Sequence, residues 1–184
     1  MHTPAALLII DLQQGMREAR LGPRNNPGAE ERLAALLAHW RARDWPRVHV
    51  RHMSLSPASV FFPGQPGAEF QPAFRPAEGE QVLEKNVPDA FALSGLERWL
   101  RVRGIQRLAI AGVASENSVE ATARSAGCLG FRTWVVADAC FTFAKADHAG
   151  RPRSADEVHD MAMANLHGEY AEVIDSQRLL AAWP

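Results

Sequence analysis

Three residues whose side chains can take part in catalysis, Asp11, Lys85 and Ser118, each stand at or close behind a short apolar segment. The Asp11 carboxylate can move a proton, and the Lys85 ammonium can keep that carboxylate ionised or stabilise developing charge. Ser118 is predicted to lie in the first turn of a helix, where free backbone N–H groups and the helix dipole favour an anion. Such N–H groups could form an oxyanion hole, so these residue types indicate acyl-transfer chemistry.

Each of the three residues also has an ordinary structural interpretation, which is the more common one from position alone. An Asp after a strand often serves as a turn or cap residue, a single Lys is usually solvated, and a Ser near a helix start is usually an N-cap. The chain contains no G-x-S-x-G, Walker A or G-x-G-x-x-G motif that would identify a nucleophile or a nucleotide site. The place of the three residues in the fold therefore decides between these interpretations.

Short apolar or alternating segments, typical of strands, alternate along the chain with segments that have helical spacing. Strands are predicted at 6–10, 47–52, 81–83, 108–112, 133–137 and 171–174, helices at 30–43, 93–103, 115–126, 154–166 and 176–182, and a long loop at 54–79. This alternation predicts βαβ units, and hence an α/β fold in which a mainly parallel sheet lies between two layers of helices. No linker or repeat interrupts the pattern, so a single domain is predicted for residues 1–184.

In such sheets, ligands bind at the carboxyl ends of the strands. Asp11, Lys85 and Ser118 all follow predicted strands, so they are expected to meet at one edge of the sheet.

Three segments, in this order, resemble the isochorismatase-like, or cysteine hydrolase, family. They are IIDLQQGM at 9–16, EKNVPDAF at 84–91 and GVASENSVEATARSAGCLGF at 112–131. The tail at 143–173, which includes His159, also matches the closing pattern of that family, and the resemblance covers residues from about 6 to 180.

The resemblance implies a Rossmann-like, three-layer α/β/α fold with a sheet of six strands and a catalytic triad of Asp11, Lys85 and position 118. Most family members hydrolyse the C–N bond of an amide, ureide or lactam through a covalent thioester. The resemblance also implies a cis peptide between Val113 and Ala114, and an oxyanion hole formed by the N–H groups of Ala114 and Ser118. The candidates for substrate contact are Phe61, Phe91, Asn117 and His52, although core packing is the default interpretation for a phenylalanine.

Position 118 departs from the family pattern, because the family's nucleophilic cysteine is Ser118 here. A thiol has a pKa of about 8.5, lower at a helix N-terminus, whereas a serine hydroxyl needs a strong adjacent base. Three explanations stay open: an engineered replacement of Cys, a natural hydrolase that uses Ser or no covalent nucleophile, and a binding module on the same scaffold. In the second case the protein could be an isochorismatase, in which Asp acts as the acid and water attacks a vinyl ether.

Neither cysteine of the chain replaces the missing thiol. Cys128 lies ten residues after Ser118, which is roughly 15 Å along a helix. Cys140 follows a predicted strand and is expected to pack in the core.

No metal or other cofactor is predicted. The nicotinamidase branch of the family has an Asp-x-His metal pair, but Val50, Arg51 and His52 occupy that stretch here, and no Cys/His cluster has zinc spacing.

With 20 basic and 21 acidic residues, the charge balance argues against a nucleic-acid partner. The apolar segment 6–10 is too short for a signal or membrane segment, and two cysteines suit a reducing compartment, so a cytoplasmic protein without a membrane partner is predicted. The expected partner is a small-molecule substrate, and the resemblance implies a homo-oligomer, a dimer or tetramer.

Overall fold

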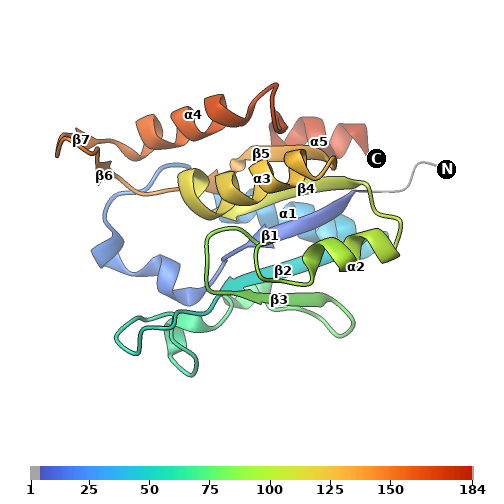
Figure 1. Ribbon diagram of the computed structural model, residues 1–184, viewed down its shortest axis with the longest axis horizontal. Helices are drawn as coiled ribbons and strands as arrows, with labels where there is room; N and C mark the ends of the chain where they lie inside the picture. The colour runs from blue at the N-terminus through green and yellow to red at the C-terminus, as the bar shows by residue number, and fades with distance from the viewer. Residues whose placement is uncertain (1–4, 184) are drawn as a thin grey trace.

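A computed structural model describes residues 5–183, which form a six-stranded sheet in the order β3-β2-β1-β4-β5-β8 with every neighbouring pair parallel (Figure 1). The strands are β1 Ala6–Ile10, β2 Arg47–His52, β3 Gln81–Lys85, β4 Arg107–Val113, β5 Arg132–Phe141 and β8 Glu172–Ile174. A small antiparallel hairpin joins β6 Lys145–Ala146 to β7 Pro152–Arg153. The predicted α/β class with a parallel six-stranded sheet is confirmed.

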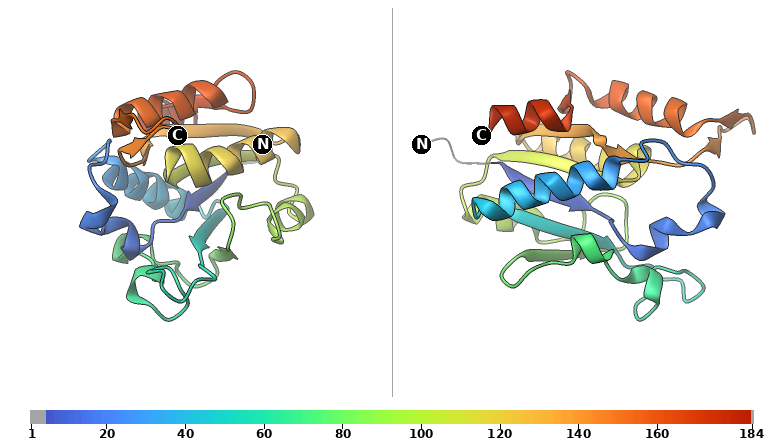
Figure 2. Two further views of the ribbon diagram at one scale, coloured as in Figure 1. Left: turned by 60° about the vertical axis from the view of Figure 1, so that its left-hand side comes forward. Right: turned by 180° about the vertical axis from the view of Figure 1, so that it is seen from behind.

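Helices cover both faces of the sheet (Figure 2). On one face lie α1 Ala29–Ala42 and α5 Ser176–Ala182, and on the other lie α2 Leu96–Val102, α3 Glu120–Cys128 and α4 Ala155–Leu166. Short 3-10 helices occupy Gln14–Arg17, Ala19–Leu21, Pro66–Ala68 and Pro72–Phe74, and a π-helical turn occupies Ser115–Val119. Among residues 5–183, no helix is long and apolar enough to cross a membrane.

The central strands are almost entirely apolar, apart from Arg107 at the start of β4, as expected for strands with helices on both faces. All five residues of β1 are fully buried. The helix α1 contributes a stripe at helical spacing, Leu33, Leu36, Leu37 and Trp40, and this stripe packs against the sheet. The core therefore lies on both sides of β1 and β4.

Most predicted strands and helices agree with the observed ones to within two residues at each end, and three differ more than this. The helix predicted from residue 93 begins at Leu96, because Leu93 has a φ of +55°, outside the helical region. The helix predicted at 115–126 is divided into the π-helical turn and α3, which extends to Cys128. The strand predicted at 133–137 continues to Phe141 after a register shift against β4. The single domain predicted for residues 1–184 stays a prediction, and residues 1–4 and 184 lie outside the described residues.

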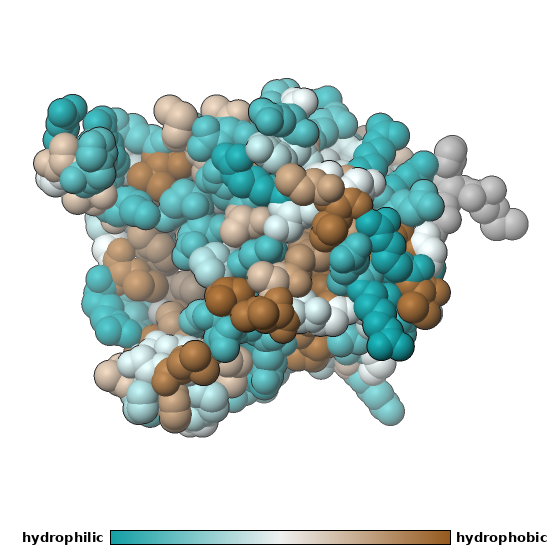
Figure 3. Space-filling view, in the orientation of Figure 1, coloured by the Kyte–Doolittle hydropathy of each residue, from teal (hydrophilic) through white to brown (hydrophobic). Residues whose placement is uncertain are grey.

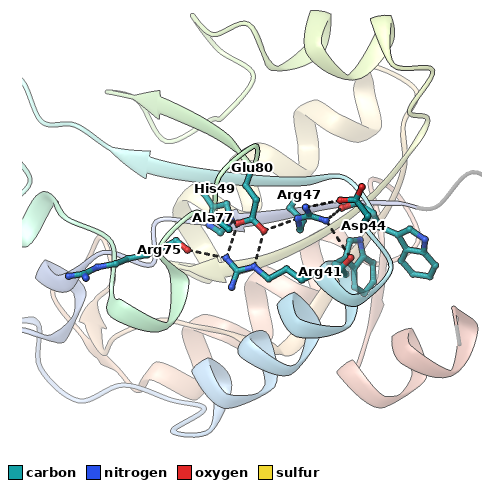
Figure 4. Close-up of polar contacts among 9 residues, drawn as sticks. Arg41, Asp44, Arg47, His49, Arg75, Ala77 and Glu80 are labelled. Atoms are coloured by element: carbon teal, nitrogen blue, oxygen red, sulfur yellow. Dashed lines mark hydrogen bonds and ion pairs between the residues drawn. The ribbon is translucent and has the colours of Figure 1, made fainter.

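Beside the amino-terminal ends of β2 and β3, a cluster of charged residues surrounds Glu80 (Figure 4). The Glu80 carboxylate accepts two hydrogen bonds of 2.8 Å from Arg41 and one of 2.9 Å from the N–H of Ala77. The ring of His49 and the guanidinium of Arg47 each lie 2.8 Å from it. Burial alone would raise the pKa of Glu80, but the hydrogen bonds from Arg41 and Ala77, with the charges around it, lower that pKa to about 2. The cluster therefore joins α1 to the edge of the sheet opposite the candidate site.

Candidate active site

The carboxyl ends of β1, β3 and β4 bring together the three residues predicted to form the triad. Asp11 follows β1 directly, Lys85 is the last residue of β3, and Ser118 lies in the π-helical turn after β4. Lys85 Nζ donates hydrogen bonds to Asp11 Oδ2 at 2.7 Å and to Ser118 Oγ at 3.2 Å. All three side chains are buried, so the ammonium links a carboxylate to a hydroxyl out of contact with bulk water.

The Asp11 carboxylate has unused hydrogen-bonding capacity. Its Oδ1 is buried and has no hydrogen-bond partner among residues 5–183. Burial raises the pKa of Asp11 above the ordinary value, against the charge and hydrogen bond of Lys85 and smaller effects of Ser118 and His52. A carboxylate with a raised pKa is a stronger base than an ordinary one, which suits proton transfer.

The turn that carries Ser118 is wide and begins next to a cis peptide. The bond between Val113 and Ala114, for which the resemblance implies a cis peptide, is cis in the structure. The Ala114 carbonyl accepts hydrogen bonds of 3.1 Å from the N–H groups of Asn117 and Val119, and the second of these spans five residues, as in a π-helix. Asn117 is exposed and Ala114 is half-buried. The turn thus holds both residues of the predicted oxyanion hole at the end of β4.

His52 and Phe61 lie on the β2 side of the site. His52 is paired in register with Lys85 of β3. Burial and the charge of Lys85 lower the pKa of His52, and the charge of Asp11 opposes them. The ring of Phe61 is 6.1 Å from that of His52 and edge-on to it. The two half-buried rings are therefore placed where a substrate could contact them.

Phe91, a candidate for substrate contact, is half-buried. Its ring packs against Phe131, with 5.7 Å between ring centroids, and Phe131 directly precedes β5 at the opposite edge of the sheet. The N–H of Ala90 donates to Thr122 Oγ1 on α3, so this segment lies against α3, four residues beyond Ser118 in the chain. Phe91 therefore lies with the hydrophobic packing around α3.

The two cysteines are away from the triad's hydrogen bonds. Cys128 is exposed at the far end of α3, and Cys140 is buried on β5. Burial raises the pKa of the Cys140 thiol to about 12, which makes it a poor nucleophile.

Gln13 has a part in the site that its sequence context does not indicate. Its side-chain amide accepts from the N–H of His52 at 2.8 Å and donates to the carbonyl of His52 at 2.9 Å and to that of Ala68 at 2.8 Å. The Gln71 side chain donates to the Gln13 carbonyl. These bonds fasten the long loop after β2 to the segment after β1. A loop glutamine is usually solvated, so no local signal could have identified it.

Comparison with known proteins identifies the family. Residues 5–178 match the isochorismatase domain. A crystal structure of an isochorismatase-family protein from Chromobacterium violaceum has a TM-score of 0.96 and 50% identity, covering 98% of this chain and 94% of that one. The isochorismatase family protein YrdC of Bacillus subtilis is 31% identical over 180 residues, 98% of this chain and 96% of that protein. Maleamate amidohydrolase of Pseudomonas putida is 29% identical over 191 residues, 94% of this chain and 83% of that enzyme.

These similarities and the parallel α/β architecture place the chain among the isochorismatase-like hydrolases. It belongs to the isochorismatase family. Among residues 5–183, no group of three or more His, Cys, Asp or Glu side chains is arranged to hold a metal ion.

Proposed function

We propose that this protein hydrolyses a C–N bond in a small amide, ureide or lactam, with Ser118 as the nucleophile. The observation that carries this proposal is the buried, continuous chain of hydrogen bonds from Asp11 through Lys85 to Ser118. The similarity to maleamate amidohydrolase supports the amide class of substrate. The proposed assembly is a homo-oligomer, a dimer or tetramer.

The direction of the hydrogen bonds suits attack by Ser118. Because Ser118 Oγ accepts from Lys85, its own proton is free to point toward the unpartnered Oδ1 of Asp11. Asp11 takes this proton as Oγ bonds to the substrate carbonyl carbon. The N–H groups of Ala114 and Ser118 bind the resulting oxyanion.

Asp11 then returns the proton to the leaving nitrogen, and the C–N bond breaks to leave an acyl ester on Ser118. Water attacks this ester and gives a proton to Asp11, which passes it to Ser118 Oγ as the ester C–O bond breaks. The acid product then leaves, and the Ser118 hydroxyl and the Asp11 carboxylate are regenerated. The Lys85 ammonium limits the cost of a negative charge on buried Asp11.

Vinyl-ether hydrolysis is the second candidate, and the raised pKa of Asp11 favours it. A protonated Asp11 could donate to the substrate while water attacks, and this route needs no nucleophile at position 118. A binding module without catalysis is the third candidate, but the intact, buried pair of Asp11 and Lys85 argues against it, because such pairs are costly to keep.

Kinetics of two variants at position 118 distinguish these functions. The native chain, Ser118→Ala and Ser118→Cys are assayed on a panel of amides, ureides and lactams and on a vinyl ether. An amidohydrolase loses its turnover of amides in Ser118→Ala and keeps or gains it in Ser118→Cys. Turnover of the vinyl ether that survives Ser118→Ala would support the second candidate instead, and binding without turnover by any form would support the third.

A further inference from the structure

Ser115 and His159 form a buried pair on the side of the π-helical turn that packs against α4. The Ser115 hydroxyl lies 2.7 Å from Nδ1 of His159. Ser115 is fully buried, and His159 is 6% exposed. The pair adjoins the site, because Ser115 directly follows Ala114 and stands three residues before Ser118. The reaction proposed above does not use it.

The shape of the π-helical turn depends on what surrounds it. Such wide turns are rare and occur mostly as single turns, frequently at functional sites. On the sheet side, Ser118 accepts a hydrogen bond from Lys85. On the opposite side, Ser115 is tied to His159 on α4. The turn is thus held between the triad and α4.

A second nucleophile is the alternative interpretation of a Ser–His pair, because histidine can activate a serine hydroxyl. Ser115 has no exposed surface, so a substrate carbonyl cannot reach its hydroxyl while the turn is folded. Burial lowers the pKa of His159, against the charges of Asp160, Asp156 and Glu116. The ring is therefore neutral near pH 7 and holds Ser115 without adding a charge behind the turn.

We propose that His159 is a positioning residue for the site, and that its hydrogen bond to Ser115 fixes the turn that places Ala114 and Ser118. Loss of this bond leaves a buried hydroxyl without its partner and allows the turn to shift. A displacement of about 1 Å at a reacting group can cost roughly a hundredfold in rate. The role assigned to His159 rests on the proposed function, but the position of the turn can be measured without a substrate.

The test uses the thiol introduced by Ser118→Cys, whose rate of alkylation by iodoacetamide reports its position and environment. In this background, His159→Leu and Ser115→Ala are each expected to slow alkylation at position 118 by roughly tenfold. The two changes together are expected to slow it no further, because both remove the same hydrogen bond. His159→Asn, whose amide can take the place of Nδ1, is expected to keep most of the rate. Peptide mass spectrometry separates position 118 from Cys128, whose exposed thiol is the internal control.

An unchanged alkylation rate at position 118 in both His159→Leu and Ser115→Ala would overturn the proposal. Equal changes at position 118 and Cys128 in folded Ser115→Ala would overturn it too, since the effect would then not be specific to the turn. If His159→Leu does not fold, Ser115→Ala, which removes a single oxygen, decides alone. Slower alkylation in a protein that hydrolyses no amide would support the role of His159 and reject the proposed function. Amide hydrolysis together with an unchanged alkylation rate would support the proposed function and reject the role of His159.

Discussion

Asp11 is subject to two opposing influences that together suit proton transfer. Burial raises its pKa, while the Lys85 ammonium, 2.7 Å away, favours the ionised form. A serine hydroxyl is a much weaker acid than a thiol, so a nucleophilic Ser118 needs a stronger base than a cysteine would. The buried carboxylate of Asp11 is such a base.

The raised pKa of Asp11 predicts the acid limb of the pH–rate profile. Asp11 must be ionised to accept a proton, and a raised pKa means that the carboxylate is protonated at a higher pH than usual. The value of kcat/KM is therefore expected to fall with decreasing pH while an ordinary carboxyl would still be ionised. A pH series of kcat/KM measures this limb, and thermal unfolding at each pH checks that the protein stays folded. An acid limb within or below the ordinary range of aspartate would refute the assignment.

Lys85→Met is expected to abolish most of the activity and to destabilise the fold, because it leaves the Asp11 carboxylate buried without its partner. Breaking a buried ion pair costs roughly 3–5 kcal/mol. Arg51→Met is the matched control, since it removes a partly exposed ion pair with Glu84 at the end of β2, and such pairs contribute about 1 kcal/mol or less. Urea unfolding measures both variants. Equal losses of unfolding free energy in Lys85→Met and Arg51→Met would contradict a special contribution of the buried pair to stability.

The meeting of Asp11, Lys85 and Ser118 could be predicted because each of them follows a predicted strand, and the carboxyl ends of parallel strands meet at one edge. The position of Phe91 could not be predicted, because it depends on the hydrogen bond between Ala90 and Thr122, which are far apart in the chain. The role of Gln13 could not be predicted for the same reason, since the partners of its side chain are distant in the chain and are brought close only by the fold.

At the scale of secondary structure, apolar periodicity predicted the strands and most helices, but not the details of their ends. The π-helical turn depends on the Ala114 carbonyl, which accepts from Val119 instead of continuing an α-helix. The register shift that lengthens β5 lies between Ile110 and Gly112 of β4. The register shift depends on the neighbouring strand, and the turn is in contact with Lys85 and His159, which are distant in the chain, so a short window of sequence predicts neither feature.

Gly112 is the point where β4 approaches β1 most closely, and Gly112→Ala is expected to be strongly destabilising. Its φ is +136°, and an added Cβ would lie 2.1 Å from the Ile10 carbonyl oxygen. Overpacking in a core costs roughly 1–3 kcal/mol or more, and the unfavourable φ adds to this. Gly95→Ala is the control, because a Cβ there meets nothing within 4 Å. Urea unfolding that shows equal losses for both variants would contradict the close approach of the two strands.

At the scale of the whole molecule, the edges formed by the carboxyl ends and the amino ends of the strands carry different groups of polar residues. The carboxyl edge holds the candidate site, and the cluster around Glu80 joins α1, β2 and β3 at the amino edge (Figure 4). On the face shown in Figure 3, apolar patches are interspersed with hydrophilic side chains. The large apolar residues exposed among residues 5–183 are Leu55, Val82, Leu93, Val102 and Met161.

The Glu80 cluster predicts how stability depends on pH. Its carboxyl pKa is lowered to about 2 in the folded chain, so the contribution of Glu80 is fully present above its ordinary pKa and is lost as pH falls from there toward pH 2. Glu80→Gln is expected to lower the free energy of unfolding at pH 7 by roughly 3 kcal/mol, because it leaves the partly buried guanidinium groups of Arg41 and Arg47 without their carboxylate. The variant should also flatten the fall in stability at acid pH.

Urea unfolding between pH 7 and pH 3 measures this effect, with the exposed neighbour Glu78 changed to Gln as the control. A Glu80→Gln protein as stable as Glu78→Gln, with the same dependence on pH, would show that the cluster contributes nothing.

The central claim, that Ser118 is an activated nucleophile, is tested most directly by trapping its acyl ester. The protein is mixed with an intact amide that it hydrolyses, and the reaction is quenched in acid. The protein is then digested, and its peptides are analysed by mass spectrometry. We predict one acyl group on the peptide that contains Ser118, and none on that peptide in Ser118→Ala. Undiminished hydrolysis by Ser118→Ala, or an acyl group on another residue during turnover, would contradict the claim.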